Sequence, residues 1–123
     1  MKILLDTHIL LWALGEPEKL SDEQIRSIES RRNTILVSSV SVAEIMIKVS
    51  IGKLEFPFDP SEVIENAGFE ELAFDIRSAA YLGKLPFHHR DPFDRMLIAA
   101  SLTHDIPIMS VDRVFNLYGC RVL

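Results

Sequence analysis

The stretch Ile3-Leu4-Leu5-Asp6-Thr7 sets the pattern of the chain: a short apolar run ends at a carboxylate, and a helix-like stretch follows. Three successive apolar residues are typical of a strand that is buried on both faces of a parallel sheet. Residues 7–14 have the composition of a helix that is apolar on nearly all sides. Residues 34–37 form a second buried-type run and also lead into a helical stretch, which ends before Gly52.

The rest of the chain continues this alternation. We expect further helices at about 21–32, 39–51, 59–66, 76–82, 91–104 and 111–118, and further strands at 69–74, 106–109 and 121–123. Ser21 begins a capping box, Ser39 or Ser41 can cap the next helix, and Asp91-Pro92 opens the clearest one. Strands separated by helices form βαβ units, so we expect an α/β fold with three layers (α/β/α) and a mainly parallel central sheet.

Length and composition limit the class of protein. A chain of 123 residues with 48% hydrophobic residues fits a single domain over residues 1–123 and is not disordered. Its mean hydropathy of +0.18 is slightly high for a small monomer, which points to apolar surface covered by a partner. The single cysteine, Cys120, excludes an internal disulfide and a cysteine-based zinc cluster. We find no secretory signal, and the longest uncharged run, residues 33–43, is far shorter than the roughly 20 residues of a membrane span, so we expect a cytoplasmic protein without membrane contact.

Four acids fall where parallel sheets bind ligands, beyond the carboxyl ends of the strands. Asp6 follows the first strand, and Asp112 follows the strand expected at 106–109. Asp94 lies in the first turn of the helix opened at Asp91, and Glu44 lies inside the helix that follows the second strand. We therefore expect the four carboxylates to meet at one edge of the sheet.

Each of these acids also has a simpler explanation. Asp6, Asp91 and Asp112 stand at helix starts, where a carboxylate accepts backbone hydrogen bonds and suits the helix dipole. Glu44 can form an ion pair with Lys48 one helical turn later. Taken singly, capping is the better reading of Asp91 and Asp112, but the common location favours a joint functional role.

A cluster of carboxylates needs something that offsets its charge. Two carboxylates about 4 Å apart repel by roughly 4 kcal/mol at an effective dielectric constant of 20, so a cluster takes up protons or binds a cation. Oxygen ligands without histidine or cysteine select Mg²⁺ or Mn²⁺. The chain has 13 Lys+Arg against 18 Asp+Glu, a net charge of −5, and the negative excess equals the four acids plus Asp91. This balance is compatible with a polyanionic substrate held by metal and local cations, but not with strong non-specific DNA binding.

Four motifs in fixed order carry a resemblance to a known family: Leu4–Thr7, Ser39–Ile45, His89–Ala99 and Ser110–Phe115. Over its whole length the chain resembles the PIN-domain nucleases of the VapC type, the toxin half of bacterial and archaeal toxin–antitoxin pairs. The resemblance implies an endoribonuclease that uses Mg²⁺ or Mn²⁺ to hydrolyse RNA phosphodiesters, with a cognate antitoxin as partner and a homodimer as assembly. Transfer, ribosomal and messenger RNA are all substrates within that family, and the sequence does not choose among them.

The resemblance also implies which residues act. Asp6, Glu44, Asp94 and Asp112 fall on the four acidic positions that bind the metal ion and position the attacking water. Asp6 and Asp94 are the expected direct ligands, while Glu44 and Asp112 complete the cage directly or through water.

Five further residues surround these acids. Asp91 is expected to cap its helix and to act from outside the direct ligands, and the hydroxyl of Ser110 is expected to support the site. Arg90, Arg95 and Arg113 flank the acids and are candidate phosphate-binding residues, although exposed salt bridges are the commoner role of such arginines.

Other interpretations fit less well. A haloacid-dehalogenase-type phosphatase needs a second aspartate two residues after Asp6, where this chain has His8, and a response-regulator receiver needs a late lysine, whereas the last one is Lys84. The serious alternative is a non-catalytic PIN-fold module that binds RNA or protein without cutting, which the intact acids disfavour. For His88 and His89, in the loop before the Asp91 helix, we expect a role in the loop or at the substrate rim.

Overall fold

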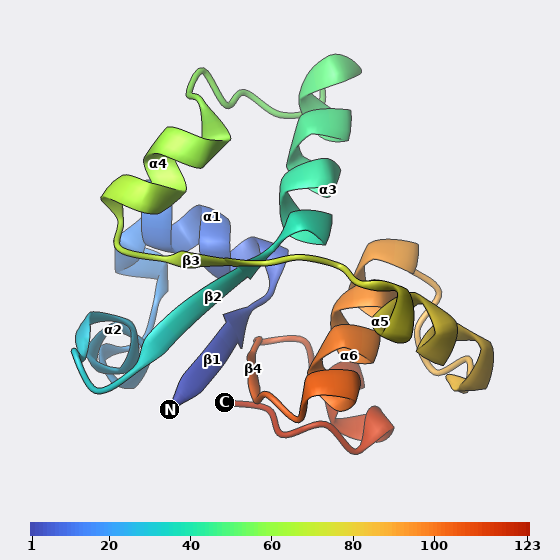
Figure 1. Cartoon of the computed structure of the whole chain (residues 1–123). Helices are drawn as coiled ribbons and strands as arrows, with labels where there is room; N and C mark the ends of the chain where they lie inside the picture. The colour runs from blue at the N-terminus through green and yellow to red at the C-terminus, as the bar shows by residue number, and fades with distance from the viewer.

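The computed structural model describes residues 1–123 and consists of four strands, six α-helices and three short 3₁₀-helices (Figure 1). The strands are β1 (Lys2–Leu5), β2 (Thr34–Ser38), β3 (Glu70–Leu72) and β4 (Ile108–Met109). The α-helices are α1 (Thr7–Gly15), α2 (Asp22–Glu29), α3 (Ser39–Ser50), α4 (Pro60–Asn66), α5 (Ile76–Tyr81) and α6 (Pro92–His104). The 3₁₀-helices are η1 (Pro17–Lys19), η2 (Leu82–Lys84) and η3 (Arg113–Tyr118). None of these helices is long and apolar enough to cross a membrane.

The four strands form one parallel sheet in the order β3-β2-β1-β4, as the βαβ pattern predicts. Leu4 of the central strand β1 pairs with Leu36 on one side and with Ile108 on the other. The strand expected at 121–123 is reduced to a single bridge between Ile108 and Val122. Since β4 itself spans two residues, it offers a further strand little length to pair with.

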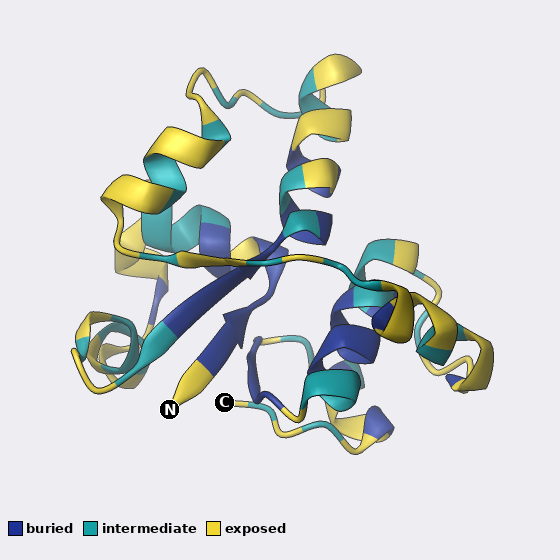
Figure 2. Cartoon of the chain, viewed as in Figure 1, coloured by how far each residue is buried: buried dark blue, intermediate teal, exposed yellow.

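Helices cover both faces of the sheet, which gives the three expected layers. Figure 1 shows α5 and α6 on one side and α1, α2 and α4 on the other. Because side chains alternate along a strand, Leu4 packs with Leu97, Ile98 and other residues of α6, while Ile3 and Leu5 pack with α1. The buried positions gather on β1, β2 and α6, whereas α4 is largely exposed (Figure 2).

The start of α3 differs from the prediction by one residue, because the hydroxyls of Ser39 and Ser41 have partners outside the helix. Ser38, not Ser39 or Ser41, is the N-cap, and its hydroxyl accepts a hydrogen bond from the Val40 N–H at 3.0 Å. Ser41 instead accepts from the Thr7 hydroxyl at 3.0 Å, which ties α3 to α1. These bonds fix the helix that carries Glu44 against the end of β1.

Candidate functional site

The segments that carry the acids meet at the carboxyl end of the sheet. Asp6 directly follows β1, and its backbone N–H donates to the Met109 carbonyl of β4 at 3.1 Å. The segment that follows β4 and carries Asp112 therefore starts beside Asp6. Glu44 lies on α3, which leaves the same edge from β2. Asp94 lies in the first turn of α6, and this turn is at the carboxyl edge because α6 runs back along the sheet before β4 begins.

Three acids do cap helices, each through one carboxylate oxygen. Oδ1 of Asp6 accepts from the Ile9 N–H at 2.8 Å, Oδ1 of Asp112 from Val114 at 3.0 Å, and Oδ1 of Asp91 from Phe93 at 2.8 Å and from Asp94 at 3.1 Å. Since a cap occupies one oxygen, the second oxygen of each of these carboxylates is free of backbone hydrogen bonds. Asp94 is not a cap, so neither of its oxygens accepts a backbone N–H. Capping and ligand binding are therefore compatible at this edge.

His89 links two of the acids, which the sequence did not predict. Its Nε2 lies 3.0 Å from Oδ2 of Asp94 and 3.0 Å from Oδ2 of Asp112. The three side chains form a group whose ligand atoms all lie within 4.8 Å of one another, and Asp6 and Glu44 are not part of this group. The sequence shows only that His89 precedes the helix start at Asp91, so its contact with the distant Asp112 emerges from the fold.

Glu44 is buried, whereas the simple ion-pair interpretation expects it to be partly exposed. Its Oε2 accepts from the Lys48 ammonium at 2.8 Å, which confirms the predicted pair, but its side chain is only 7% exposed. The other oxygen, Oε1, is buried without a hydrogen-bond partner. A buried carboxylate oxygen without a partner is costly, so this atom lacks the ligand that such an oxygen needs.

The electrostatics of the site show that the acids act on one another. Burial and the neighbouring Asp91 raise the pKa of Asp94 to about 7; Glu44 and Asp6 also raise it, and His89 opposes the shift. Burial raises the pKa of Asp6 above its ordinary value, and Asp112 adds to this effect. The carboxylates of these segments therefore lie near enough for the charge of one to change the pKa of another.

Comparison with known proteins identifies the family. The family model described as "PIN domain" matches residues 3–119 of the chain. This chain belongs to the PIN domain family. A search of curated proteins gives no match.

Solved structures share the fold of this PIN domain at low sequence identity. VapBC2 from Rickettsia felis, bound to a DNA fragment of its promoter, has a TM-score of 0.77 and 16% identity, covering 100% of this chain and 98% of the other. DNA-bound VapBC from Salmonella typhimurium has a TM-score of 0.74 and 19% identity, with coverages of 100% and 97%. FitAcB from Neisseria gonorrhoeae has a TM-score of 0.65 and 17% identity, with coverages of 98% and 96%. At these identities the similarity shows the fold alone.

The residues at the edge of this PIN domain fit a divalent cation. Carboxylate oxygens are the donors that Mg²⁺ and Mn²⁺ prefer, and several are free of backbone hydrogen bonds. The unpartnered Oε1 of Glu44 and the raised pKa values of Asp6 and Asp94 are what a carboxylate cluster without its cation should have. Oxygens of Asp94 and Asp112 lie within 4.8 Å of each other, and both contact Nε2 of His89.

Ser110, the expected supporting residue, lies beside two of the acids. It is buried, and its Oγ accepts from the Asp112 N–H at 3.0 Å, which fixes the backbone that carries that acid. The same hydroxyl lowers the pKa of Asp6, opposing the larger effect of burial. Ser110 thus touches two of the four acids.

The three arginines differ in their surroundings, and the structure does not support phosphate binding by Arg95. Its guanidinium is buried, donates to the carbonyls of Pro86 at 2.9 Å and Leu85 at 3.4 Å, and lies 4.0 Å from the ring centroid of Phe87. Arg95 therefore holds the loop before α6. Arg90 and Arg113 are exposed and stay candidates.

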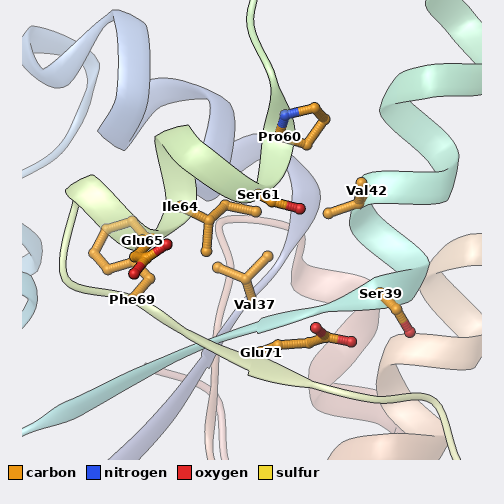
Figure 3. Close-up of a pocket in the computed structure, with 9 residues that line it drawn as sticks. All are labelled: Val37, Ser39, Val42, Pro60, Ser61, Ile64, Glu65, Phe69 and Glu71. Atoms are coloured by element: carbon orange, nitrogen blue, oxygen red, sulfur yellow. The ribbon is translucent and has the colours of Figure 1, made fainter.

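A separate hollow of about 290 Å³ lies between α3 and α4 (Figure 3). Its lining consists of Val37, Ser39, Val42, Pro60, Ser61, Ile64, Glu65, Phe69 and Glu71. None of the clustered acids is among these residues. This hollow is therefore separate from the carboxylate site.

The raised pKa of Asp94 predicts how the stability of the ion-free PIN domain depends on pH. The unfolded carboxyl has its ordinary pKa of 3.8 and the folded one a pKa of about 7, so the folded state binds more protons between these values. The free energy of unfolding should therefore fall as the pH rises from about 4 to 7. We expect a loss of about 3 kcal/mol, or roughly 12 °C in Tm, measured by thermal unfolding in EDTA. Asp94→Asn should flatten this slope, and an equal slope in both proteins would contradict the assignment.

Proposed function

We propose that this PIN domain is an endoribonuclease that depends on Mg²⁺ or Mn²⁺. The observation that carries the proposal is the meeting of Asp6, Glu44, Asp94 and Asp112 at one edge of the sheet, where burial and mutual repulsion raise carboxyl pKa values. Keeping such a cluster without a cation costs free energy, and a divalent cation removes that cost. Binding of RNA or protein without cleavage does not require a cluster of carboxylates, so the acids favour the nuclease over the non-catalytic alternative.

The proposed roles follow from the position of each side chain. A divalent ion supplies Lewis acidity toward a scissile phosphate and an attacking water. Asp94 and Asp112 offer oxygens within 4.8 Å of each other, Asp6 and Glu44 offer oxygens from the two neighbouring segments, and Ser110 fixes the backbone at Asp112. The exposed Arg90 and Arg113 hold phosphates of the RNA at the rim.

Cleavage by the purified protein tests this proposal. We expect it to cut single-stranded RNA in Mg²⁺ or Mn²⁺ and to leave the same RNA intact in EDTA. A DNA strand of the same sequence is the matched substrate control, and mapping of the RNA ends after induced expression identifies the natural target. RNA binding without turnover in either ion would contradict the nuclease and support the binding module.

We also propose that the chain is the toxin of a toxin–antitoxin pair and binds an antitoxin protein. The similar solved structures are VapBC and FitAcB, and this chain has apolar surface that suits a protein partner. Leu11, Trp12 and Leu14 are half-buried and line, with Leu54, Phe56 and Phe58, a hollow of about 430 Å³. Expression of the chain alone should arrest growth, and co-expression of the protein encoded beside it should relieve the arrest. The expected homodimer is a separate point, which the mass of the purified chain in light scattering tests.

A further inference from the structure

His89 occupies a central place in the cluster, yet its role does not follow from the four acids. Its Nε2 lies between Oδ2 of Asp94 and Oδ2 of Asp112, 3.0 Å from each, and its side chain is 17% exposed. An imidazole nitrogen there can act in two ways. It can offer a lone pair to the metal ion, or it can offer an N–H to the two carboxylates.

The other ring nitrogen decides between these two roles. The backbone N–H of Asp91 donates to Nδ1 of His89 at 3.2 Å, so Nδ1 uses its lone pair as an acceptor. A proton on Nδ1 would point at that N–H, so the ring carries its hydrogen on Nε2. Nε2 therefore presents an N–H to both carboxylates and has no lone pair to offer a cation.

The fold holds the ring in this position from several sides. The backbone N–H of His89 donates to the Tyr118 hydroxyl at 2.7 Å, and the ring packs edge-on against Phe115 at 6.1 Å between centroids. Arg95 fixes the preceding turn through the carbonyls of Leu85 and Pro86. These contacts come from η3 and α6, so both ends of the loop are anchored independently of the carboxylates.

We propose that His89 is a positioning residue that holds Asp94 and Asp112 together through one shared N–H, and that it is not a ligand of the metal ion. The inference rests on the proposed metal-dependent function. Two carboxylates whose ligand atoms lie within 4.8 Å repel each other, and a donor shared between them offsets this repulsion before the ion arrives. Without the donor, ion binding must first bring the two side chains together, so the affinity falls.

Titration with Mn²⁺ followed by electron paramagnetic resonance tests the positioning role. His89→Ala should bind Mn²⁺ about tenfold more weakly than the wild type. His89→Gln places an amide N–H near the position of Nε2, so it should restore the affinity to within about threefold of the wild type. His88→Ala and His88→Gln are the matched controls, because His88 is exposed and contacts Tyr118 and not the carboxylates. Unchanged affinity in His89→Ala, or no Mn²⁺ binding by the wild type, would overturn the proposal.

Electron spin-echo modulation of bound Mn²⁺ tests the second half of the proposal on the wild type alone. A directly bound imidazole produces a strong ¹⁴N coupling, and we expect none. A coupling that is present in the wild type and lost in His89→Gln would make His89 a ligand and refute the inference, even if His89→Ala fails to fold. The proposed function fails separately: a protein that binds Mn²⁺ in this way but cuts no RNA would contradict the nuclease and leave the role of His89 intact.

Discussion

Asp94→Asn is expected to lower the rate of metal-dependent RNA cleavage by at least about 100-fold, which corresponds to roughly 3 kcal/mol of lost transition-state stabilisation. Asparagine has the shape of aspartate but lacks the charge that holds a cation. Asp94 caps no helix, and its backbone N–H is held by Asp91, so the start of α6 should be unaffected. The measurement is kcat on a defined RNA in Mg²⁺ and in Mn²⁺.

Asp6→Asn separates the helix-capping role of Asp6 from its proposed role in binding the metal ion. Asparagine is as good an N-cap as aspartate, so the bond from the Ile9 N–H should survive while the charge disappears. The rate should fall by a similar factor, with the far-ultraviolet circular dichroism unchanged. Asp105→Asn is the matched control, because that side chain is 94% exposed and its residue has the left-handed conformation that asparagine tolerates. Wild-type cleavage by Asp6→Asn or Asp94→Asn would refute the site.

The parts of the fold that local sequence determines were predicted correctly. Ile3-Leu4-Leu5 and residues 34–37 are central strands, the capping box at Ser21 opens α2, and Asp91 caps α6. In these cases the signal is the run of apolar residues or the side chain that accepts the first backbone N–H. The placement of the acid-bearing segments at one edge was also predictable, because the carboxyl ends of parallel strands share one edge.

The features that were missed depend on contacts between distant segments. Ser38 replaced Ser39 and Ser41 as the cap of α3, because those two hydroxyls bond to Phe74 and Thr7. Arg95 has the sequence context of a phosphate-binding arginine, but the loop at residues 85–87 folds over it.

The contact of His89 with Asp112 joins residues that are 23 positions apart in the sequence. Local patterns carry no information on such pairs, because both segments must first be placed by the sheet. The same reasoning applies to the burial of Glu44. Its i,i+4 lysine is visible in the sequence, but the packing of α3 against α1 and α6 is not.

Adding Mn²⁺ to the ion-free protein should raise its Tm by about 10 °C when the ion is present at about 100 times its dissociation constant. A ligand that binds only the folded state stabilises it by about 2.7 kcal/mol at that excess, and 1 kcal/mol shifts the Tm of a domain of this size by about 4 °C. The structural reason is that the cation replaces the repulsion around Asp94 and offers a partner to the unpaired Oε1 of Glu44.

This shift depends on the carboxylates and not on any RNA, so it tests the metal site independently of the substrate. Asp94→Asn should start from a higher Tm in EDTA at neutral pH, because it lacks the buried charge, and should gain little from Mn²⁺. Asp105→Asn should respond as the wild type does, and sodium chloride at matched ionic strength separates specific binding from screening. Equal shifts in Asp94→Asn and the wild type would place the ion elsewhere, since a cation held by these carboxylates cannot stabilise the fold equally after one of their charges has been removed.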